Sequence, residues 1–452
     1  MFSKILIANR GEIACRVARA ARALGVETVA VYSDADKGAL HVESCDEAVH
    51  LGPSPAKDSY LDAGKVLAAA RQTGAQAIHP GYGFLSEQAG FAQACAEAGI
   101  VFVGPPPGAM HAIKDKAQAR AVMRAAGVPV VPGSDGHVGD ESAAKAAAAS
   151  IGYPLLVKAA AGGGGIGMQV AKDEAELLKA LRACADRARA SFGKDAVYLE
   201  RYFPAPRHVE VQILGDGHLT LALGARECSI QRRHQKIVEE APPPAFQLPE
   251  PRPRLLRELL DAGLRAARAV GYANAGTCEF LLVGDEFFFI ELNARLQVEH
   301  PITELTTGLD LVQLQLRIAA GEKLQIGQGD LAPRGHAIEC RVNAEDPVRF
   351  FPSPGKISRF DPPVPADGTV HDGIRVDAGY RTGDTVTPFY DSLLAKVVAW
   401  GETREQATAR MREALRRFTV EGVKTNLPAH LKVLQSEAFA RGEIDTRFLE
   451  RI

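Results

Sequence analysis

The residues from 287 to 300 carry the most evident chemistry in this sequence. Read with a period of two, apolar residues fall on one side, from Phe288 through Ile290 to Val298. A row of polar side chains falls on the other side: Glu291, Asn293, Arg295, Gln297 and Glu299. Such a row offers oxygen ligands for a hard cation, a guanidinium for an oxyanion and a carboxylate that can accept a proton. The alternative is an antiparallel strand whose outer face lies in water, which is common.

A second strand precedes this stretch and carries Glu279. If the connecting loop has three residues, 284–286, Glu279 sits opposite Glu291 on the same face, whereas a two-residue loop would put them on opposite faces. We expect the three-residue loop, so that both carboxylates and the Asn293 carbonyl converge. Hard oxygen ligands of this kind suit a Mg²⁺ ion that bridges nucleotide phosphates. Pro301 follows closely, so the regular strand is expected to stop near Asn293 and residues 296–300 are predicted as a loop.

Four consecutive glycines, Gly162 to Gly165, lie between two strand-like segments, 153–158 and 168–170. Glycines lose more backbone entropy on ordering than any other residue, so this run is unsuited to a rigid core. Its bare amides suit a mobile cover over phosphate oxygens. No Gly-Lys-Ser/Thr follows, so the run is not a Walker A loop. A flexible linker is the alternative.

Composition sets the class of protein. A chain of 452 residues is expected to form two or three domains at about 150 residues each. The net charge of −2 gives no electrostatic reason to bind nucleic acid or an anionic membrane, and no apolar run reaches the ~18 residues of a membrane span. The 7 cysteines include no CxxC pair, which fits a reducing cytoplasm and argues against disulfides or a zinc site.

The elements that must position these side chains follow from periodicity. The first part alternates strands and helices, which predicts a parallel, helix-covered sheet, a doubly wound α/β domain. The expected elements are strands 4–8, 27–32, 77–78 and 101–103, and helices 12–24, 60–73 and 108–126. The loop 79–87 contains Pro80 and two glycines and lies at the carboxyl edge of this sheet, where ligands bind; a purely structural turn is the alternative.

The remaining chain is predicted as α+β. A small unit has helices 141–150 and 173–190 with strands 153–158, 168–170 and one ending at 199–203. A larger antiparallel unit is expected from strands 208–213, 219–225 and 276–282, a β-rich region 336–400, and helices 252–270, 309–320 and 403–417. The predicted division is residues 1–113, a linker 114–132, a small mobile domain 133–203, and a C-terminal domain 204–452.

Several longer runs resemble biotin carboxylase, the ATP-grasp component of biotin-dependent carboxylases. They are Ile7–Ile13, Ile78–Glu87, Gly162–Gly167, Gln231–Lys236, Arg295–Pro301 and Glu339–Pro347. The resemblance spans nearly the whole chain and implies the ATP-grasp fold. It also implies a reaction in which ATP phosphorylates bicarbonate to carboxyphosphate, and biotin on a carrier protein is then carboxylated at its ureido nitrogen.

The resemblance assigns roles residue by residue. ATP binding is implied for Lys116, Lys158, Gly163, Gly164, Gly165, Glu200, Phe203, His208, Gln231, His234 and Leu281. The implied ligands of Mg²⁺ or Mn²⁺ are Glu279, Glu291 and Asn293, and the implied bicarbonate site is Lys236, Arg295, Gln297, Val298 and Glu299. Tyr82 and Arg341 match the biotin site. The catalytic set is then Lys236, Arg295, Glu299 as general base, and Arg341, which steadies the biotin enolate; His234 and His300 could instead be ordinary packed histidines.

The chain departs from the family pattern at Ile166, where acyl-CoA and pyruvate carboxylases generally carry Arg or Lys. No Met-Lys-Met biotinylation site occurs, so biotin is expected on a biotin carboxyl carrier protein that is another chain or a domain outside this sequence, with a carboxyltransferase as further partner. The family implies a cytoplasmic homodimer: Arg19 matches an interface position, whereas residues 360–375 diverge. The main alternative is another ATP-grasp ligase that joins a carboxylate to an amine through an acyl phosphate. That ligase would not need the Arg295–Glu299 row.

Overall fold

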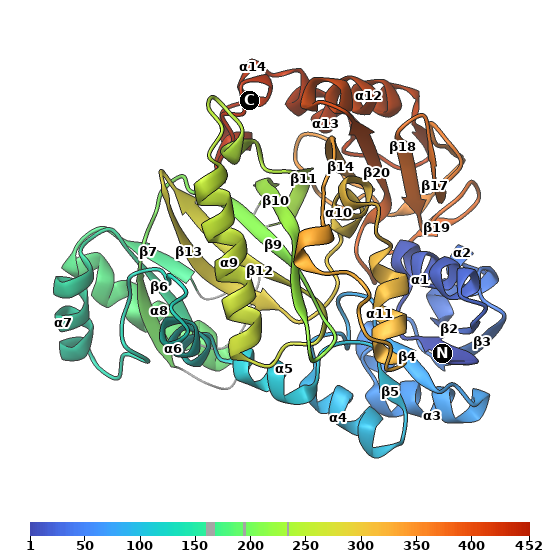
Figure 1. Cartoon of the computed structure of the whole chain (residues 1–452), viewed down its shortest axis with the longest axis horizontal. Helices are drawn as coiled ribbons and strands as arrows, with labels where there is room; N and C mark the ends of the chain where they lie inside the picture. The colour runs from blue at the N-terminus through green and yellow to red at the C-terminus, as the bar shows by residue number, and fades with distance from the viewer. Residues whose placement is uncertain (160–167, 193–195, 233–234) are drawn as a thin grey trace.

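The computed structural model describes residues 1–159, 168–192, 196–232 and 235–452 (Figure 1). The first part of the chain forms a five-stranded parallel sheet in the order β3-β2-β1-β4-β5. Its strands are β1 Lys4–Ile7, β2 Glu27–Ser33, β3 Glu47–Gly52, β4 Ala77–His79 and β5 Val101–Phe102. Its helices are α1 Gly11–Ala23, α2 Leu40–Glu43, α3 Ala63–Thr73, α4 Ala89–Glu97 and α5 Pro107–Lys114. The predicted parallel sheet is confirmed.

The two faces of strand β1 enter two different cores, as expected of a doubly wound sheet. Ile5 and Ile7 pack with α1 and with residues of the C-terminal unit. Leu6 and Ala8 pack with α3 and α4 on the opposite face. This arrangement fixes the carboxyl ends of β1 and β4, and therefore the loop 79–87, against the rest of the molecule.

The predicted single helix 108–126 is wrong. The chain forms α5 and then α6, Lys116–Ala125, with a break at Asp115. Asp115 has an extended backbone, and its side chain accepts a hydrogen bond from the Gln118 amide at 2.9 Å. It therefore acts as an N-cap that starts a new helix, which an apolar periodicity continuing through the position does not reveal.

The small unit packs two helices on an antiparallel sheet of order β7-β6-β8. The elements are α7 Glu141–Ile151, β6 Leu155–Ala159, β7 Met168–Ala171, α8 Glu174–Phe192 and β8 Val197–Arg201. The two strand-like segments before and after the glycine run are strands and pair with each other: Leu155 pairs with Ala171 and Lys158 with Met168. The glycines themselves, Gly162 to Gly165, lie outside the described residues.

The C-terminal unit is built on a nine-stranded antiparallel sheet of order β13-β12-β9-β10-β11-β14-β20-β18-β17. Its strands are β9 Arg207–Gly215, β10 Thr220–Arg232, β11 Gln235–Ala241, β12 Asn274–Val283, β13 Glu286–Asn293, β14 His336–Asn343, β17 Asp367–His371, β18 Ile374–Ala378 and β20 Leu393–Gly401. Short strands β15 Gly355–Lys356 and β19 Thr385–Val386 pair with each other, as do β16 Arg359–Asp361 and β21 Thr419–Glu421. The predicted antiparallel C-terminal unit is confirmed.

Helices pack on both halves of this sheet. Helix α9, Pro253–Ala269, lies across β9, β10 and β12 and shares their core (Figure 1). Helix α12, Arg404–Arg417, packs on β14 and β20. The other helices are α10 His300–Thr307, α11 Leu311–Ala319, α13 Leu427–Gln435 and α14 Glu437–Ala440. Of these, α10, α13 and α14 were not predicted.

The β12–β13 hairpin corrects one expectation and confirms another. Val283 pairs with Glu286, so the turn has two residues, Gly284 and Asp285, and the predicted three-residue loop is wrong. Glu279 nevertheless pairs with Glu291, because a β-bulge at Ile290 shifts the register between Glu279 and Phe280. The predicted convergence of the two carboxylates is therefore correct, but for a different reason.

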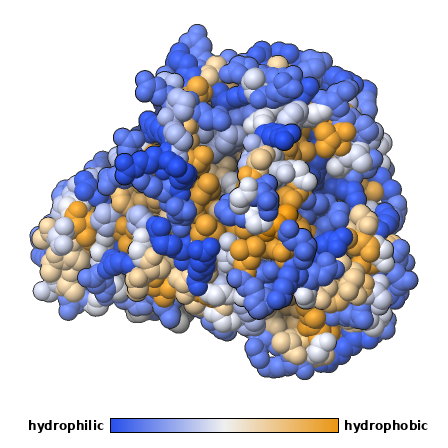
Figure 2. All heavy atoms as spheres, viewed as in Figure 1, coloured by the Kyte–Doolittle hydropathy of each residue, from blue (hydrophilic) through white to orange (hydrophobic). Residues whose placement is uncertain are grey.

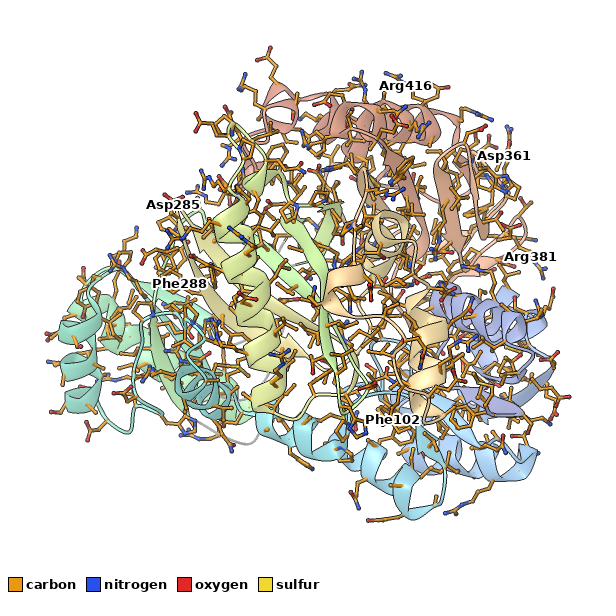
Figure 3. The ribbon with its side chains drawn as sticks, viewed as in Figure 1. Phe102, Asp285, Phe288, Asp361, Arg381 and Arg416 are labelled. Atoms are coloured by element: carbon orange, nitrogen blue, oxygen red, sulfur yellow. The ribbon has the colours of Figure 1, made fainter. Side chains whose placement is uncertain are left out.

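The bulge also changes which aromatic side chains enter the core. Phe287 and Phe289 are buried, whereas Phe288 is only half-buried, so the predicted apolar face is wrong before the bulge. The ring of Phe288 instead stacks on Phe203, with centroids 5.3 Å apart. Figure 3 labels Asp285 in the turn and Phe288 beyond it, on the edge of the sheet beside the small unit.

No described helix is long and apolar enough to cross a lipid bilayer. Figure 2 shows that hydrophilic residues cover most of the face seen there, with apolar residues gathered in smaller patches nearer its centre.

Beneath the sheet surface, Arg226 ties four elements together. Its side chain is fully buried and hydrogen-bonds to Glu210 and Gln212 on β9, to Thr277 on β12 and to Thr303 on α10. The buried ion pair of Arg226 with Glu210 is costly to break, because removing one partner leaves an uncompensated buried charge.

We expect Arg226→Met to lower the free energy of unfolding by about 3–5 kcal/mol, because Glu210 and three polar groups lose their donor. Chemical denaturation measures this change. The matched control is Arg254→Met, because Arg254 is 86% exposed and pairs with Glu258 on the same helix; its expected cost is about 0.5 kcal/mol or less. Equal shifts in the two variants would contradict the structural role of Arg226.

Candidate active site

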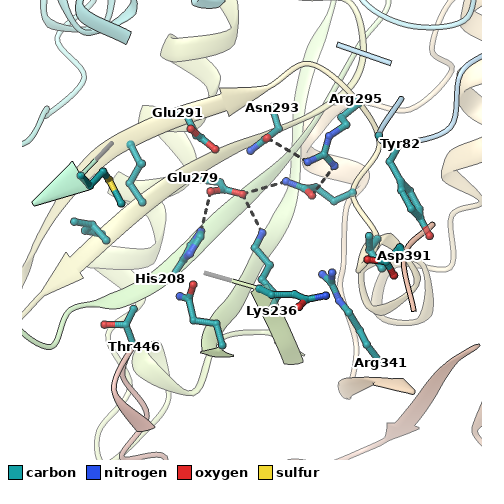
Figure 4. Close-up of a pocket in the computed structure, with 18 of the residues that line it drawn as sticks. Tyr82, His208, Lys236, Glu279, Glu291, Asn293, Arg295, Arg341, Asp391 and Thr446 are labelled. Atoms are coloured by element: carbon teal, nitrogen blue, oxygen red, sulfur yellow. Dashed lines mark hydrogen bonds and ion pairs between the residues drawn. The ribbon is translucent and has the colours of Figure 1, made fainter. Parts of the chain in front are cut away.

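A cavity of about 1410 Å³ opens where the three units meet. Its wall takes residues from the loop 79–87, from the small unit and from β9 to β14 of the large sheet. Figure 4 shows charged and amide side chains converging on it from different strands. The cavity is therefore the candidate active site.

Lys236, on β11, lies at the centre of the charges in this cavity. Its Nζ is 2.6 Å from Glu210 Oε2, 2.9 Å from Glu279 Oε1 and 2.7 Å from Glu299 Oε1. Burial alone would lower the pKa of Lys236, but the three carboxylates outweigh burial and raise that pKa well above its usual value. The lysine is therefore a permanent cation held among three anions.

Glu279, Glu291 and Asn293 face the cavity from two paired strands. Glu279 and Glu291 are directly opposite each other, and Asn293 pairs with Thr277 two residues along. Lysines approach the carboxylates from both sides: Lys116 Nζ is 3.1 Å from Glu291 Oε2, and Lys236 contacts Glu279. Two carboxylates and an amide oxygen on neighbouring positions fit the hard-oxygen preference of Mg²⁺.

The polar row continues past β13 in a loop, as predicted. Residues 294–299 are irregular, and Glu299 is the N-cap of α10. Arg295 donates to Gln297 Oε1 at 2.9 Å, and its Nε lies 3.1 Å from Glu87 Oε2. His300 is fully buried beside the Gln297 carbonyl, and burial holds its pKa well below the usual value, so it is a neutral packed histidine that shapes the loop.

Arg341, on β14, closes the other side of the polar row 295–299. Its Nη2 is 3.0 Å from Glu299 Oε2, and its Nε donates to Glu239 Oε1 at 2.7 Å. Burial would raise the pKa of Glu299, but the surrounding cations, Lys236 first and then Arg341, hold it well below its usual value. Glu299 is thus an ionised carboxylate that forms ion pairs with Lys236 and Arg341.

The loop 79–87 reaches the same cavity. Asn9 donates to the carbonyls of Pro80 and Tyr82 at 2.7 and 2.8 Å. Gly81 has φ +62°, and a Cβ there would lie 2.9 Å from Asn9 Nδ2, so only glycine fits this turn. The hydroxyl of Tyr82 donates to Glu12 at the start of α1. The loop is therefore a built part of the cavity wall rather than a surface turn.

The predicted nucleotide residues line the opposite end of the cavity. They are Lys116, Lys158, Glu200, Phe203, His208, Gln231 and Leu281. The carboxylate of Glu200 pairs with both Lys158 and Arg120, and His208 Nε2 lies 3.0 Å from Glu279 Oε2. The predicted Gly163, Gly164, Gly165 and His234 lie outside the described residues, as does Ile166.

Sequence reasoning missed the carboxylates that hold the cations in place. Glu210, Glu239, Glu87 and Glu12 each hold a cavity side chain, and none was assigned a role. Glu210 had a readable signal, because an acidic residue occupies an interior position of the strand 208–213. Glu87 had one as well, because it ends a loop already expected to bind ligand.

Three family models match the chain in series. The biotin carboxylase N-terminal domain matches residues 1–110, the ATP-binding domain of the carbamoyl-phosphate synthase L chain matches 115–327, and the biotin carboxylase C-terminal domain matches 339–451. Biotin carboxylase 1 of Bacillus subtilis is 48% identical over 454 residues, which cover 100% of this chain and 98% of the relative. The chain belongs to the biotin carboxylase family.

Solved structures agree over the same span. A biotin carboxylase–β,γ-ATP complex from Campylobacter jejuni has a TM-score of 0.95 and 41% identity, and covers 100% of this chain and 99% of that one. The biotin carboxylase domain dimer of Hydrogenobacter thermophilus 2-oxoglutarate carboxylase, in complex with MgADP and bicarbonate, has a TM-score of 0.92 and 44% identity, with 100% and 98% covered. The chain thus has the ATP-grasp fold of an ATP-dependent ligase that forms a C–N bond.

The relatives serve different carboxylases. A pyruvate carboxylase component from Methanothermobacter thermautotrophicus is also 48% identical over 453 residues, which cover 100% of this chain and 90% of the relative. Equal identity to these relatives does not single out one carboxyl acceptor.

We expect Lys236→Met to destabilise the protein by about 3–5 kcal/mol at pH 8 and by less at pH 5. Without the lysine, the folded-state pKa values of Glu279 and Glu299 rise above their unfolded values, because burial raises both and the largest opposing cation is gone. Stability then rises as pH falls, because the folded state binds protons more tightly than the unfolded chain.

Denaturation of wild type and variant at both pH values measures the difference. Lys424→Met is the control, since Lys424 is 68% exposed and pairs only at the surface with Asp346. A destabilisation by Lys236→Met that does not change with pH would show that charge compensation is not its cause.

Proposed function

We propose that this cavity carboxylates biotin in two steps, with ATP first activating bicarbonate as carboxyphosphate. The observation that carries the proposal is the placement of Lys236, Arg295 and Arg341 in one cavity wall with the Glu279–Glu291–Asn293 group. Glu299 is fully buried just behind this wall, 2.7 Å from Lys236 and 3.0 Å from Arg341. A ligase that joins a carboxylate to an amine needs the second group, whereas bicarbonate activation needs both.

Bicarbonate would bind between Arg295, Gln297, the Val298 amide and Lys236. The guanidinium of Arg295 is oriented by Glu87 and Gln297, so its planar fork is set before the planar oxyanion arrives. Lys236 adds a fixed positive charge from the sheet below. Because these groups are already in position, the site orients bicarbonate without having to rearrange its own side chains, which lowers the entropic part of the barrier.

Glu299 would take the proton that bicarbonate loses as it attacks phosphorus. Its oxygens are held by Lys236 and Arg341, which keep it ionised but a weak base. A bound oxyanion shares the charge of Lys236, so the pKa of Glu299 rises when substrate is present. The base therefore becomes effective in the occupied site.

ATP would lie along the opposite end of the cavity. Lys116 and Lys158 face the phosphates, Glu200 holds Lys158 in place, and the backbone near Phe203 with Leu281 meets the adenine. His208 and Gln231 line the same space, and the proposal extends to Gly163, Gly164, Gly165 and His234. Glu279, Glu291 and Asn293 would hold Mg²⁺ or Mn²⁺, which neutralises phosphate charge during phosphoryl transfer.

Biotin would enter beside Tyr82 and Arg341. Deprotonation of its ureido group places negative charge on the ureido oxygen, and the buried guanidinium of Arg341 is the cation positioned to stabilise it. Released phosphate is the base that the scheme requires for this proton. Biotin would arrive on a biotin carboxyl carrier protein and leave toward a carboxyltransferase.

We further infer a cytoplasmic homodimer and a four-part division at residues 1–113, 114–132, 133–203 and 204–452. Arg19 Nη2 lies 2.7 Å from the buried Asp377, and the arginine keeps 31% of its side chain exposed beside the proposed interface. The relative from Hydrogenobacter thermophilus is itself a domain dimer.

We expect ATP cleavage to depend on bicarbonate and to rise with free biotin. Glu299→Gln should lower the bicarbonate-dependent rate by about 10²–10⁴-fold, because the proton acceptor is lost while the shape is kept. Coupled ADP release measures the rate, and nucleotide binding by the variant is the control. Stimulation by an amine or amino acid without bicarbonate would instead identify the rival ligase.

We expect Glu291→Gln to raise the Mg²⁺ concentration needed for half-maximal ATP cleavage by about 10-fold or more, since a charged oxygen ligand becomes neutral. Titration of Mg²⁺ at saturating ATP measures the shift. Glu286→Gln, in the same strand but exposed and outside the cavity, is the matched control. Unchanged Mg²⁺ dependence in Glu291→Gln would remove this residue from the metal site.

A further inference from the structure

Two glutamates lie opposite each other on neighbouring strands next to Arg341. Glu239 on β11 pairs with Glu339 on β14, and both side chains are fully buried. Directly opposed residues on antiparallel strands have Cβ atoms about 4.5–5.5 Å apart, so the two carboxyl groups are neighbours. Arg341 donates to Glu239 Oε1 at 2.7 Å. The other oxygen of Glu239 and both oxygens of Glu339 have no hydrogen-bond donor among the described residues.

The cations around this pair are already engaged. Lys396 on β20 is fully buried and directs its Nζ to the Val298 carbonyl at 3.0 Å and to Glu12 at 3.2 Å. Lys236 is held by its own three carboxylates, and Arg341 also serves Glu299.

The remaining titratable groups nearby bring no positive charge. Cys228 is buried and Tyr82 partly buried, both with raised pKa values, and His300 is buried with a lowered pKa, so all three are neutral. Two ionised carboxylates side by side without a donor are strongly unfavourable in a buried site.

We propose that Glu239 and Glu339 share one proton, carried by Glu339, and that the pair positions Arg341 for the carboxylation of biotin. This inference rests on the proposed role of Arg341. A protonated Glu339 donates to the free oxygen of Glu239 and leaves the other oxygen to Arg341. The Arg341 guanidinium then lies beside one negative charge, that of Glu239, instead of two. Its positive charge is less neutralised and can stabilise the oxyanion that forms on biotin.

The titration behaviour of the pair agrees with this geometry. Burial raises the pKa of Glu239 to about 7 from 4.5, with Glu299 adding to the rise and Arg341 and Lys236 opposing it. Burial likewise raises the pKa of Glu339 well above its usual value, with Lys396 opposing. Since the folded state holds the proton more tightly, the stability contributed is present below the unfolded pKa and is lost as pH rises through the folded one.

Infrared spectroscopy tests the proton directly. The wild-type protein in D₂O at neutral pH should show the C=O stretch of a buried protonated carboxyl group, and Glu339→Gln should remove it. Glu421→Gln is the control, because Glu421 is exposed at 57%, and should leave the band unchanged. Absence of the band in wild type, or its persistence in Glu339→Gln, would overturn the shared proton. This readout does not depend on any enzymatic activity.

Kinetics test the positioning role. Glu239→Gln should lower kcat/KM for free biotin by about 10- to 100-fold, the range for a lost charged hydrogen bond, with little change in ATP cleavage driven by bicarbonate alone. Glu339→Gln keeps a neutral donor at the same place and should remain near wild type, whereas Glu339→Ala should not. An equal loss of both activities in Glu239→Gln, or equal damage by the two Glu339 variants, would overturn positioning.

Failure of the proposed function and failure of the glutamate pair give different results. If wild type cleaves ATP without bicarbonate dependence, the proposed function fails whatever the infrared band shows. If ATP cleavage depends on bicarbonate and biotin, the proposed function stands. If in that case the carboxyl infrared band and the selective loss of biotin activity in Glu239→Gln are both absent, the glutamate pair does not position Arg341.

Discussion

The site depends on one buried lysine being surrounded by carboxylates from three different segments. Lys236 holds Glu210 of β9, Glu279 of β12 and Glu299 at the start of α10 within 2.9 Å. Lys236 is the cation common to all three carboxylates, while Arg226, His208 and Arg341 each pair with one of them. The lysine could not stay charged in this site without the carboxylates. The geometry of the proposed metal ligands, base and anion site therefore depends on this shared charge balance, which the antiparallel sheet assembles from distant parts of the chain.

The sheet explains why the functional residues come in alternating patterns along several strands. Lys236, Glu279 and Arg341 belong to different strands of the order β13-β12-β9-β10-β11-β14, with their side chains on the cavity side. The opposite side of these strands enters the core under α9 and α12. The proposed chemistry is thus carried by rigid elements, while Tyr82 and Glu87 are added from a loop and the fully buried Glu299 from the start of α10.

Much of this arrangement could be predicted from the sequence, but some of it needs tertiary information. The parallel first sheet, the hairpin formed by the strands of Glu279 and Glu291, and the loop after Asn293 follow from local pattern, whereas the pairing of the two glutamates depends on the bulge at Ile290. The bulge at Ile290 does not follow from local pattern, because one extra residue in a strand does not alter the alternation of apolar and polar residues in the sequence. The partners of Arg226 and Arg341 also do not, since they lie up to 102 residues away and their identity depends on which strands become neighbours.

The bulge at Ile290 has a consequence for how this nucleotide site can vary. On its turn side, β13 places Ile290 in the cavity wall and stacks Phe288 on the cavity residue Phe203. On the other side it gives Glu291 and Asn293. The irregularity separates these two halves of one strand. Changes of side-chain size near the turn can therefore remodel recognition of the nucleotide base without moving the oxygen ligands, so the two properties can be engineered or can evolve independently.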